Sequence, residues 1–335
     1  MKKNVLFALA QPHYQKMFHP VDLERIGRAC QVLPVQPPDQ ADRAYLLRHV
    51  GPADIVISSW GTAPLDEQVM AQASHLQLLA HAGGTIKPFV SDALWDRNVR
   101  VTSAAAALAF GVAEFCLGLM LTASKRAFWA GLATRQGQWT ESLEAFGGPQ
   151  EIYQQNIGVI GASHVGRHLV RLLQNFTCNV LLYDPYCTAE QAEALGAMKV
   201  QTLEELFSQC TVVSLNAPLT GQTRGMIRAE HFKLLPPGAL FINTARSPIV
   251  DEVQMIQALR TGRFVACIDV TEPEPPPPDH PLRHLPNVWL TPHEAGAVAQ
   301  NLQRIGTFVA DEIEAFAAGK PLHYPVTREQ LAIVG

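Results

Sequence analysis

The sequence is poor in the features that mark proteins outside the ordinary globular class. Its 335 residues contain only six cysteines, widely separated and without a CxxC pair, which argues against a disulfide framework and a metal centre. It has no long basic run and a formal net charge of −4, which argues against nucleic acid and anionic membranes as partners. We therefore expect a cytoplasmic protein without a bound metal.

Long apolar runs are also scarce. A membrane-spanning helix needs about 20 apolar residues, and we expect no segment of this chain to meet that need. The apolar run from Val5 to Ala10 is brief and ends at Gln11-Pro12-His13, so it predicts a buried first strand and not an export signal. The chain length predicts two domains, because one domain usually takes roughly 100–200 residues.

Short apolar runs alternate with amphipathic stretches along almost the whole chain, which is typical of parallel βαβ units. In the first part, strands are expected at Val5–Leu9, Asp54–Ser58, Leu76–Ala80 and Val99–Thr102, with helices near Val21–Cys30, Ala41–Val50 and Leu65–Ala73. In the second part, strands are expected at Ile157–Ile160, Val180–Tyr183, Val212–Leu215, Ala239–Ile242, Phe264–Ile268 and Val288–Leu290, with helices at His164–Asn175, Ala189–Leu195, Leu203–Phe207 and Glu252–Arg260. The fold class is therefore α/β, with two doubly wound parallel sheets.

Two long apolar helical segments, Ala104–Ala130 and Ala295–Ala318, bracket the second series of strands. The first series needs the segment after Leu290 to be complete. We therefore expect one discontinuous domain, residues 1–103 and 291–335, with a second domain of residues 104–290 inserted into it. The proline-rich stretch Pro273–Pro281 is expected to be a loop.

A glycine-rich turn follows the first strand of the inserted domain. Gly161 and Gly166 match the first and third glycines of GxGxxG, and Ser163 occupies the middle position. In this motif the turn and the following helix N-terminus hold a pyrophosphate, and the Ser163 hydroxyl is a candidate donor to it. Asp184 ends the next strand, where a ribose diol is read. No arginine or lysine lies between residues 185 and 198, so NAD is favoured over NADP.

Three polar side chains follow three later strands of the inserted domain, namely Arg246, Glu274 and His293. The carboxyl ends of parallel strands face the ligand crevice, so the three can converge. A guanidinium binds a carboxylate in a fixed fork. An imidazole donates or accepts a proton near neutral pH, and a carboxylate beside it orients the ring. The set predicts hydride chemistry on a 2-oxo or 2-hydroxy acid.

Several further stretches lie in an order that matches one known family. They are Val112-Ala113-Glu114, the turn from Gly161 to Gly166, Ala217-Pro218-Leu219-Thr220 with Thr223, Asn243-Thr244-Ala245-Arg246, Val250-Asp251-Glu252, Asp269-Val270 with Glu274-Pro275, and Thr291-Pro292-His293. Across nearly its whole length the sequence resembles the D-isomer-specific 2-hydroxyacid dehydrogenases.

The resemblance implies an enzyme that moves a hydride between NAD(H) and C2 of a small D-2-hydroxy or 2-oxo acid. It implies a homodimer, and a Rossmann NAD domain inserted in a flavodoxin-like substrate-binding domain. The implied catalytic residues are Arg246, Glu274 and His293. The implied substrate contacts are Gly83, Gly84 and Arg246. The implied cofactor contacts are Gly161, Ser163, His164, Val165, Gly166, Asp184, Ala217, Pro218, Thr223, Thr244, Ala245, Arg246, Asp269, His293 and Gly296, with Asp269 at the nicotinamide end.

The sequence departs from the family pattern at a few positions. Ser163 and Ser247 stand where glycine is usual, and Lys87 follows the glycine loop as a candidate second anion contact. Side-chain selection is expected around residues 60, 81 and 85, and the acid itself stays open. Two alternatives share the fold: an NADH-sensing corepressor, and a formate or phosphite dehydrogenase. Formate enzymes resemble this family but place glutamine where Glu274 stands, which disfavours that alternative.

Overall fold

The computed structural model describes residues 2–139, 145–296 and 298–333. The chain divides into two compact units: unit 1, Met1–Leu108 with Ala297–Gly335, and unit 2, Ala109–Gly296. The boundaries at 108 and 296 lie five and six residues after the expected ones at 103 and 290. The second boundary precedes helix α13 (Ala299–Ala317). The helix expected at Ala295–Ala318 therefore begins later, and its residue 297 lies outside the described residues.

Unit 1 contains a sheet of six strands within its described residues, in the order β13-β5-β4-β3-β1-β2. The strands are β1 (Asn4–Ala8), β2 (Gln31–Val32), β3 (Ile55–Ser59), β4 (Leu78–Ala82), β5 (Arg100–Ser103) and β13 (Pro325–Val326). The first five are parallel, and their order is that of a flavodoxin-like sheet, as expected. The edge strand β13 pairs antiparallel with β5, which the sequence did not predict.

Both faces of this sheet are covered by helices, which explains why its strands are apolar throughout. Successive residues of β1 point to opposite faces: Phe7 joins one core cluster and Leu6 the other. The helices of unit 1 are α1 (Gln11–Met17), α2 (Pro20–Ala29), α3 (Arg43–His49), α4 (Glu67–Gln72), α5 (Asp92–Asp96) and α13. Helices α1, α2 and α13 supply the cluster around Phe7, and α3, α4 and α5 supply the cluster around Leu6.

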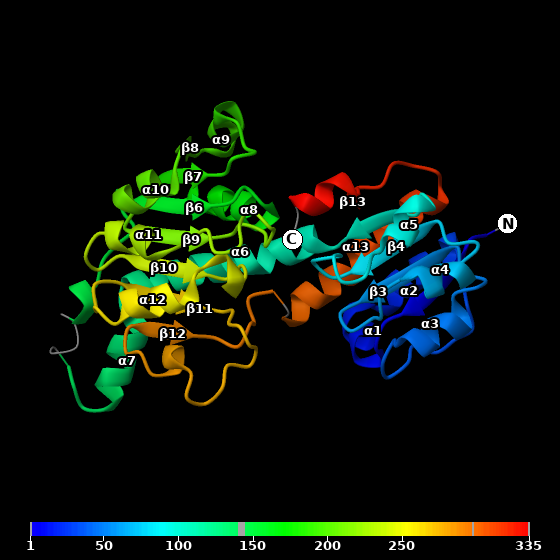
Figure 1. The fold of residues 1–335 in the computed structure, drawn as a ribbon, viewed down its shortest axis with the longest axis horizontal. Coiled ribbons are helices and arrows are strands. Elements are labelled where there is room, and N and C mark those ends of the chain that lie inside the picture. Colours follow the sequence, from blue (N-terminus) through cyan, green and yellow to red (C-terminus); the bar gives the residue numbers. More distant parts are fainter. Residues whose placement is uncertain (1, 140–144, 297, 334–335) are drawn as a thin grey trace. The chain divides into compact units, whose positions relative to one another are not determined.

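Unit 2 contains a parallel sheet of seven strands within its described residues, in the order β12-β11-β10-β9-β6-β7-β8. Figure 1 shows them stacked from β8 at the top to β12 at the bottom. The strands are β6 (Asn156–Ile160), β7 (Asn179–Tyr183), β8 (Met198–Lys199), β9 (Val212–Leu215), β10 (Leu240–Asn243), β11 (Val265–Ile268) and β12 (Val288–Leu290). The first six follow the 3-2-1-4-5-6 order of the Rossmann fold, and the two-domain α/β prediction is confirmed.

Helices also cover both faces of the second sheet. They are α6 (Ala105–Ser124), α7 (Ala127–Arg135), α8 (His164–Leu173), α9 (Ala189–Leu195), α10 (Leu203–Gln209), α11 (Ala229–Leu234) and α12 (Glu252–Leu259). Helices α10 to α12 pack on one face and α6 and α8 on the other. Among the described residues of unit 2, 3-10 turns lie at Ala145–Gly147, Ser247–Ile249 and Pro281–Arg283. The stretch before Pro281 is a loop, as predicted.

The helix expected at Ala104–Ala130 is two helices, α6 and α7. Arg126 separates them with a left-handed backbone, φ 56°. Its buried guanidinium donates to the carbonyls of Ala123 (2.9 Å) and Gly238 (2.5 Å). The charge is thus satisfied by carbonyls where the helix ends, because a buried cation needs such partners.

The expectation that no segment could span a membrane was wrong by the measure of length and composition. Helix α6 has 20 residues and a mean hydropathy of 1.9 in its most apolar window, enough to cross a bilayer by that test alone. Ala113, Cys116 and Met120 of the same helix are buried in the core of unit 2. The core helix of a globular protein passes this test as well, so the result is weak evidence for a membrane span.

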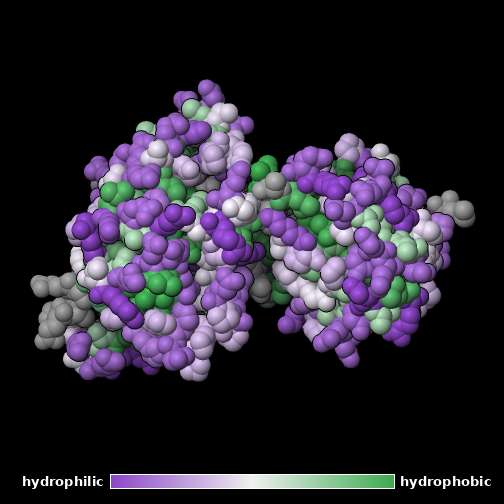
Figure 2. Space-filling view, viewed as in Figure 1, coloured by the Kyte–Doolittle hydropathy of each residue, from purple (hydrophilic) through white to green (hydrophobic). Residues whose placement is uncertain are grey.

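Figure 2 shows a surface that is mostly hydrophilic, with small hydrophobic patches on both units. The six cysteines are free thiols, and five of them are buried. Burial raises the pKa of Cys116 to about 11 and that of Cys210 and Cys267 to about 12. These three thiols are therefore protonated and unreactive at neutral pH.

Candidate active site

The glycine turn after β6 has no room for side chains at two positions. Gly161 has φ +98°, and a Cβ there would lie 2.6 Å from the Cα of Ala217. At Gly166 a Cβ would lie 2.0 Å from the carbonyl oxygen of Gly161. The first glycine therefore makes the turn and lets β6 approach the segment after β9. The third lets α8 pack against the end of β6.

Ser163, the unusual middle residue of the turn, does not need the conformational freedom of glycine. Its φ is −64° and its ψ is 176°, an extended conformation open to any residue. Its hydroxyl donates to the carbonyl of Asn216 at 2.7 Å and accepts from the amide of Gly166 at 3.3 Å. Ser163 is therefore the N-cap of α8. Its proton is directed at Asn216 and not at a phosphate, which corrects the expected role of this hydroxyl.

The cap leads to a stability prediction. Ser163→Ala should lower the free energy of unfolding by about 1 kcal/mol, because it leaves a helix N–H and the Asn216 carbonyl without this partner. Thermal unfolding followed by circular dichroism should show a melting temperature about 2–4 °C lower. Ser163→Gly removes the same hydroxyl but fits the family pattern, so NADH affinity should be retained in that variant. A Ser163→Ala protein as stable as the parent would contradict the assigned cap.

Asp184, at the end of β7, is tied directly to the glycine turn. One carboxylate oxygen accepts from the amide of Ala162 at 2.7 Å, and the other accepts from the amide of Tyr186 at 2.7 Å. A carboxylate offers about four acceptor sites, so each oxygen can accept a further hydroxyl. The structure thus brings together the turn and the predicted ribose-binding acid.

The rest of the predicted cofactor set lies at neighbouring strand ends of unit 2. His164 opens α8, and its pKa is lowered by burial and by nearby Arg167. Its imidazole is therefore neutral at pH 7. Thr223 follows β9 and donates to the carbonyl of Pro218 at 2.6 Å, which closes that loop. Thr244 follows β10 and lies 3.0 Å from the thiol of Cys116. Val165, Ala245 and Gly296 lie in the corresponding segments after β6, β10 and β12.

His293 and Glu274 form a close pair. The Nδ1 atom of His293 lies 2.7 Å from a carboxylate oxygen of Glu274. The second oxygen of Glu274 accepts from the amide of Thr271 at 3.0 Å, which fixes the carboxylate. Both side chains stay accessible, with exposed fractions of 44% and 39%. The Nε2 atom of the ring can therefore reach a ligand while Nδ1 is held.

The backbone around His293 is held by Asp269. His293 has a left-handed conformation, φ 52°, which is uncommon outside glycine and costs energy unless its surroundings impose it. The carboxylate of Asp269 accepts from the amides of Glu294 and Ala295, both at 3.1 Å. It also accepts from the hydroxyl of Thr291 at 2.6 Å. Asp269 is buried, and it fastens both flanks of the histidine.

Arg246 follows β10 in a turn made rigid by Asn243, whose side-chain oxygen accepts from the amide of Ala245 at 3.0 Å. Its guanidinium donates to the carbonyl of Ala245 at 2.6 Å and interacts electrostatically with Glu274. Ser247 starts a 3-10 turn without a positive φ, so its backbone does not require glycine. The structure therefore gathers Arg246 and the histidine–glutamate pair at one end of the sheet.

The glycine loop of unit 1 directly follows β4. The hydroxyl of Ser103 donates to the carbonyl of Gly84 at 2.5 Å and contacts that of Gly83 at 3.3 Å. Because a peptide is planar, the amides that follow these carbonyls point away from Ser103. The sequence indicated the glycines but gave no signal for Ser103, whose contact is with backbone atoms only.

His81 lies beneath this loop. It is fully buried, its Nδ1 lies 2.9 Å from the hydroxyl of Ser58, and burial lowers its pKa to about 3. A Cβ on Gly83 would lie 2.5 Å from its Nε2. His81 is therefore an uncharged packing partner that requires glycine at position 83.

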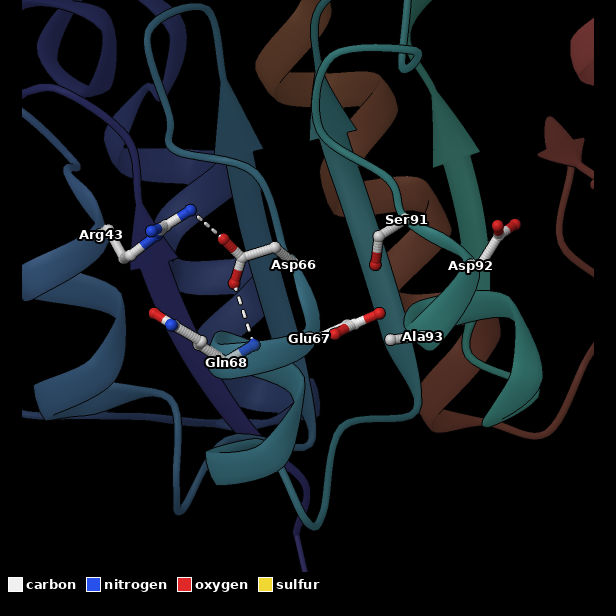
Figure 3. Close-up of a pocket in the computed structure, with 7 residues that line it drawn as sticks. All are labelled: Arg43, Asp66, Glu67, Gln68, Ser91, Asp92 and Ala93. Atoms are coloured by element: carbon white, nitrogen blue, oxygen red, sulfur yellow. Dashed lines mark hydrogen bonds and ion pairs between the residues drawn. The ribbon is translucent and has the colours of Figure 1, made fainter.

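One surface hollow of about 410 Å³ lies elsewhere on unit 1, at the amino ends of α3, α4 and α5. Figure 3 shows Arg43 directed at Asp66, which also caps α4 by accepting from the amides of Gln68 and Val69. None of the predicted site residues lines this hollow. Arg43, Asp66 and Asp92 in its lining already form ion pairs, and we assign it no function.

Fold and site together define a dinucleotide-binding α/β protein with an acid–base pair. A Rossmann sheet, a turn in which Cβ atoms would clash, and the helix N-terminus that follows this turn fit a dinucleotide. Comparison with known proteins gives the family. The model of the NAD-binding domain of D-isomer specific 2-hydroxyacid dehydrogenases matches residues 117–295. The chain belongs to that family, and its cofactor is NAD.

Individual relatives agree with this assignment. The chain is 32% identical to D-3-phosphoglycerate dehydrogenase of Methanocaldococcus jannaschii, over 82% of this chain and 52% of that protein. It is 30% identical to glyoxylate reductase of Thermofilum pendens, over 93% and 92%. In fold it is similar to D-mandelate dehydrogenase of Rhodotorula graminis, with a TM-score of 0.84, 23% identity and 98% coverage of both chains. The chain spans about half the length of the phosphoglycerate enzymes it matches.

Proposed function

We propose that the protein is an NAD-dependent oxidoreductase that interconverts a small 2-oxo acid and the D-2-hydroxy acid. The observation that carries the proposal is the pair of His293 and Glu274, 2.7 Å apart and accessible. It lies in the same unit as the dinucleotide turn, at the carboxyl end of the same sheet. One nitrogen of this imidazole is held by Glu274, and the side chain as a whole is 44% exposed.

The other steps of the proposed reaction are assigned to residues of the chain. Bound NAD supplies or accepts the hydride at C2. Arg246 binds the carboxylate of the acid and fixes which face of C2 is presented. In the reductive direction, His293 donates its Nε2 proton to the carbonyl oxygen, and in the oxidative direction it accepts the hydroxyl proton. Glu274 holds the ring through Nδ1 and stabilises the imidazolium form.

The glycine loop is the segment of unit 1 that we assign to substrate binding. We assign unit 1 as the substrate-binding domain and unit 2 as the NAD-binding domain. The amides of Gly84 and Thr85, which follow the two carbonyls held by Ser103, are suited to bind the carboxylate, whereas the amide of Gly83 already donates to the carbonyl of His81 at 2.9 Å. Neutral His81 below the loop adds no positive charge, so this binding relies on backbone dipoles.

The reaction is tested by following NADH absorbance with glyoxylate, hydroxypyruvate, pyruvate, phenylpyruvate and phosphohydroxypyruvate. Arg246→Gln should raise KM for every acid that is turned over, and kcat/KM should fall by about 10²-fold because a charge-assisted fork is lost. Arg263→Gln, remote from the strand-end site, is the matched control. Measurable NADH binding without turnover of any acid would remove the proposal and favour the NADH-sensing alternative.

Two further properties are part of the proposal. Helices α6 and α7 leave Phe110, Leu121 and Leu132 of unit 2 exposed by 36%, 36% and 49%, a surface suited to a second copy of the chain. We therefore propose a homodimer, with twice the chain mass of 36.7 kDa by light scattering. A monomer at micromolar concentration would contradict it. The cytoplasmic location stays a prediction.

A further inference from the structure

Three segments of unit 1 meet at the carboxyl end of its sheet. Trp60 directly follows β3, and the glycine loop directly follows the neighbouring strand β4. The register pairs Ser59 with Ala82, so Trp60 stands level with Gly83. Helix α1 follows β1, the neighbour of β3 on its other side. His13 of this helix and Trp60 therefore lie beside the loop that we assign to the substrate carboxylate.

His13 and Trp60 are in direct contact. Their rings meet edge to face, with centroids 5.7 Å apart. Burial and the nearby charge of Lys16 lower the pKa of His13, against a backbone hydrogen bond at Trp60 that raises it. The imidazole is therefore neutral at pH 7. Its Nδ1 is buried and has no hydrogen-bond partner within the described residues. The two rings form an aromatic wall, in which the Nδ1 atom of His13 is a polar atom without a hydrogen-bond partner among the described residues.

The surroundings of this wall are also aromatic and mostly uncharged. His81, neutral because its pKa is about 3, stacks on Phe89 with ring centroids 4.4 Å apart. Trp60 packs against the core cluster that contains Phe7. His81 and Phe89 are buried, so of these rings only those of His13 and Trp60 stay partly exposed.

The lysines near the glycine loop are poorly suited to binding a phosphate. A phosphate dianion is usually bound by arginine forks or by several donors. Near the loop, Lys87 is partly buried, and burial lowers the pKa of its ammonium. Lys16 lies on the exposed side of α1. Neither provides the planar, bidentate recognition that arginine gives.

We propose that the preferred substrate is a 2-oxo acid with an uncharged aromatic side chain, which packs against the wall of His13 and Trp60. The proposal rests on the proposed function, because it names the acid on which that reaction acts. Aromatic rings pack edge to face or offset at 4.5–7 Å, the geometry that His13 and Trp60 already show between themselves.

The test compares kcat/KM for phenylpyruvate with kcat/KM for glyoxylate, which has no side chain. We expect the parent protein to favour phenylpyruvate by about tenfold or more, and Trp60→Ala to lower the ratio of the two values by about tenfold. Trp60→Leu keeps an apolar side chain and serves if the alanine variant fails to fold. Trp139→Ala makes the same change at a side chain that is 76% exposed in unit 2, and its ratio should match the parent.

The outcomes separate the two proposals. Turnover of glyoxylate with an unchanged ratio in both Trp60 variants would overturn the aromatic substrate and leave the reaction standing. Preference for phosphohydroxypyruvate, lost in Lys87→Met, would overturn it in favour of an anionic side chain. Absence of turnover with every acid would remove the reaction itself, and the substrate inference with it.

Discussion

His293→Asn should lower kcat for 2-oxo acid reduction by about 10²–10⁴-fold, the contribution of a positioned general acid. Asparagine is the informative replacement because His293 has a left-handed backbone, which asparagine tolerates better than alanine. The imidazole is thereby removed with little change to the backbone that Asp269 holds. Stopped-flow measurement of NADH consumption gives the rate, and NADH fluorescence gives the affinity, which should stay within about threefold of the parent.

His75→Asn is the matched control, because His75 is exposed on unit 1 and belongs to no part of the site. Its kcat should equal that of the parent. If the His293 variant kept more than a third of the parent kcat, the assignment of the proton donor would be wrong. Glu274→Gln should give an intermediate loss, since the ring would keep a hydrogen-bond partner but lose the charge that stabilises the imidazolium.

Gly166→Ala should disrupt both unit 2 and the cofactor site. The added Cβ would lie 2.0 Å from the carbonyl oxygen of Gly161, a backbone atom that cannot move aside cheaply. Overpacking of this kind costs about 3 kcal/mol, which corresponds to a melting temperature lowered by roughly 10 °C. NADH affinity should fall by about tenfold or more, because α8 must move away from the glycine turn that we expect to hold the pyrophosphate. Calorimetry and fluorescence titration measure the two effects.

Gly131→Ala is the matched control for this substitution. Gly131 lies in α7, and a Cβ there would meet no atom within 4 Å. Alanine in a helix is favoured over glycine by about 0.5–1 kcal/mol, so this variant should be as stable as the parent or more stable. If the two alanine variants had the same melting temperature, close helix–strand packing at Gly166 would be refuted.

Much of the fold could be predicted from the sequence because buried parallel strands are apolar throughout. The strands at Val212–Leu215 and Val288–Leu290 were placed at their observed bounds, and the other predicted strands within about two residues. The two-residue strands β2, β8 and β13 could not be seen, because a pair of residues has no periodicity. The break between α6 and α7 was missed for a different reason. Arg126 ends the helix through carbonyls that are remote in sequence, including that of Gly238.

The site could be predicted where its residues lie directly after strands. Arg246, Glu274 and His293 were placed together because parallel strands deliver their carboxyl ends to one side. Their supports were not visible, since Thr271 acts on Glu274 through its backbone amide. The sequence showed that Ser163 departs from the usual glycine of the motif. Its role as a helix cap follows only from its contacts with Gly166 and Asn216.

The insertion of unit 2 into unit 1 has a consequence for synthesis. Unit 2 is one continuous segment, whereas the core of unit 1 needs Ile305, Val309 and Ile313 of α13. The 188 residues from 109 to 296 are translated before these partners exist, which takes roughly 10–40 s at typical ribosomal speeds. During that time the nascent first third has an unfinished apolar sheet face. Unit 2 is therefore the first unit whose sequence is complete, and the earlier segment needs protection by chaperones until α13 has been made.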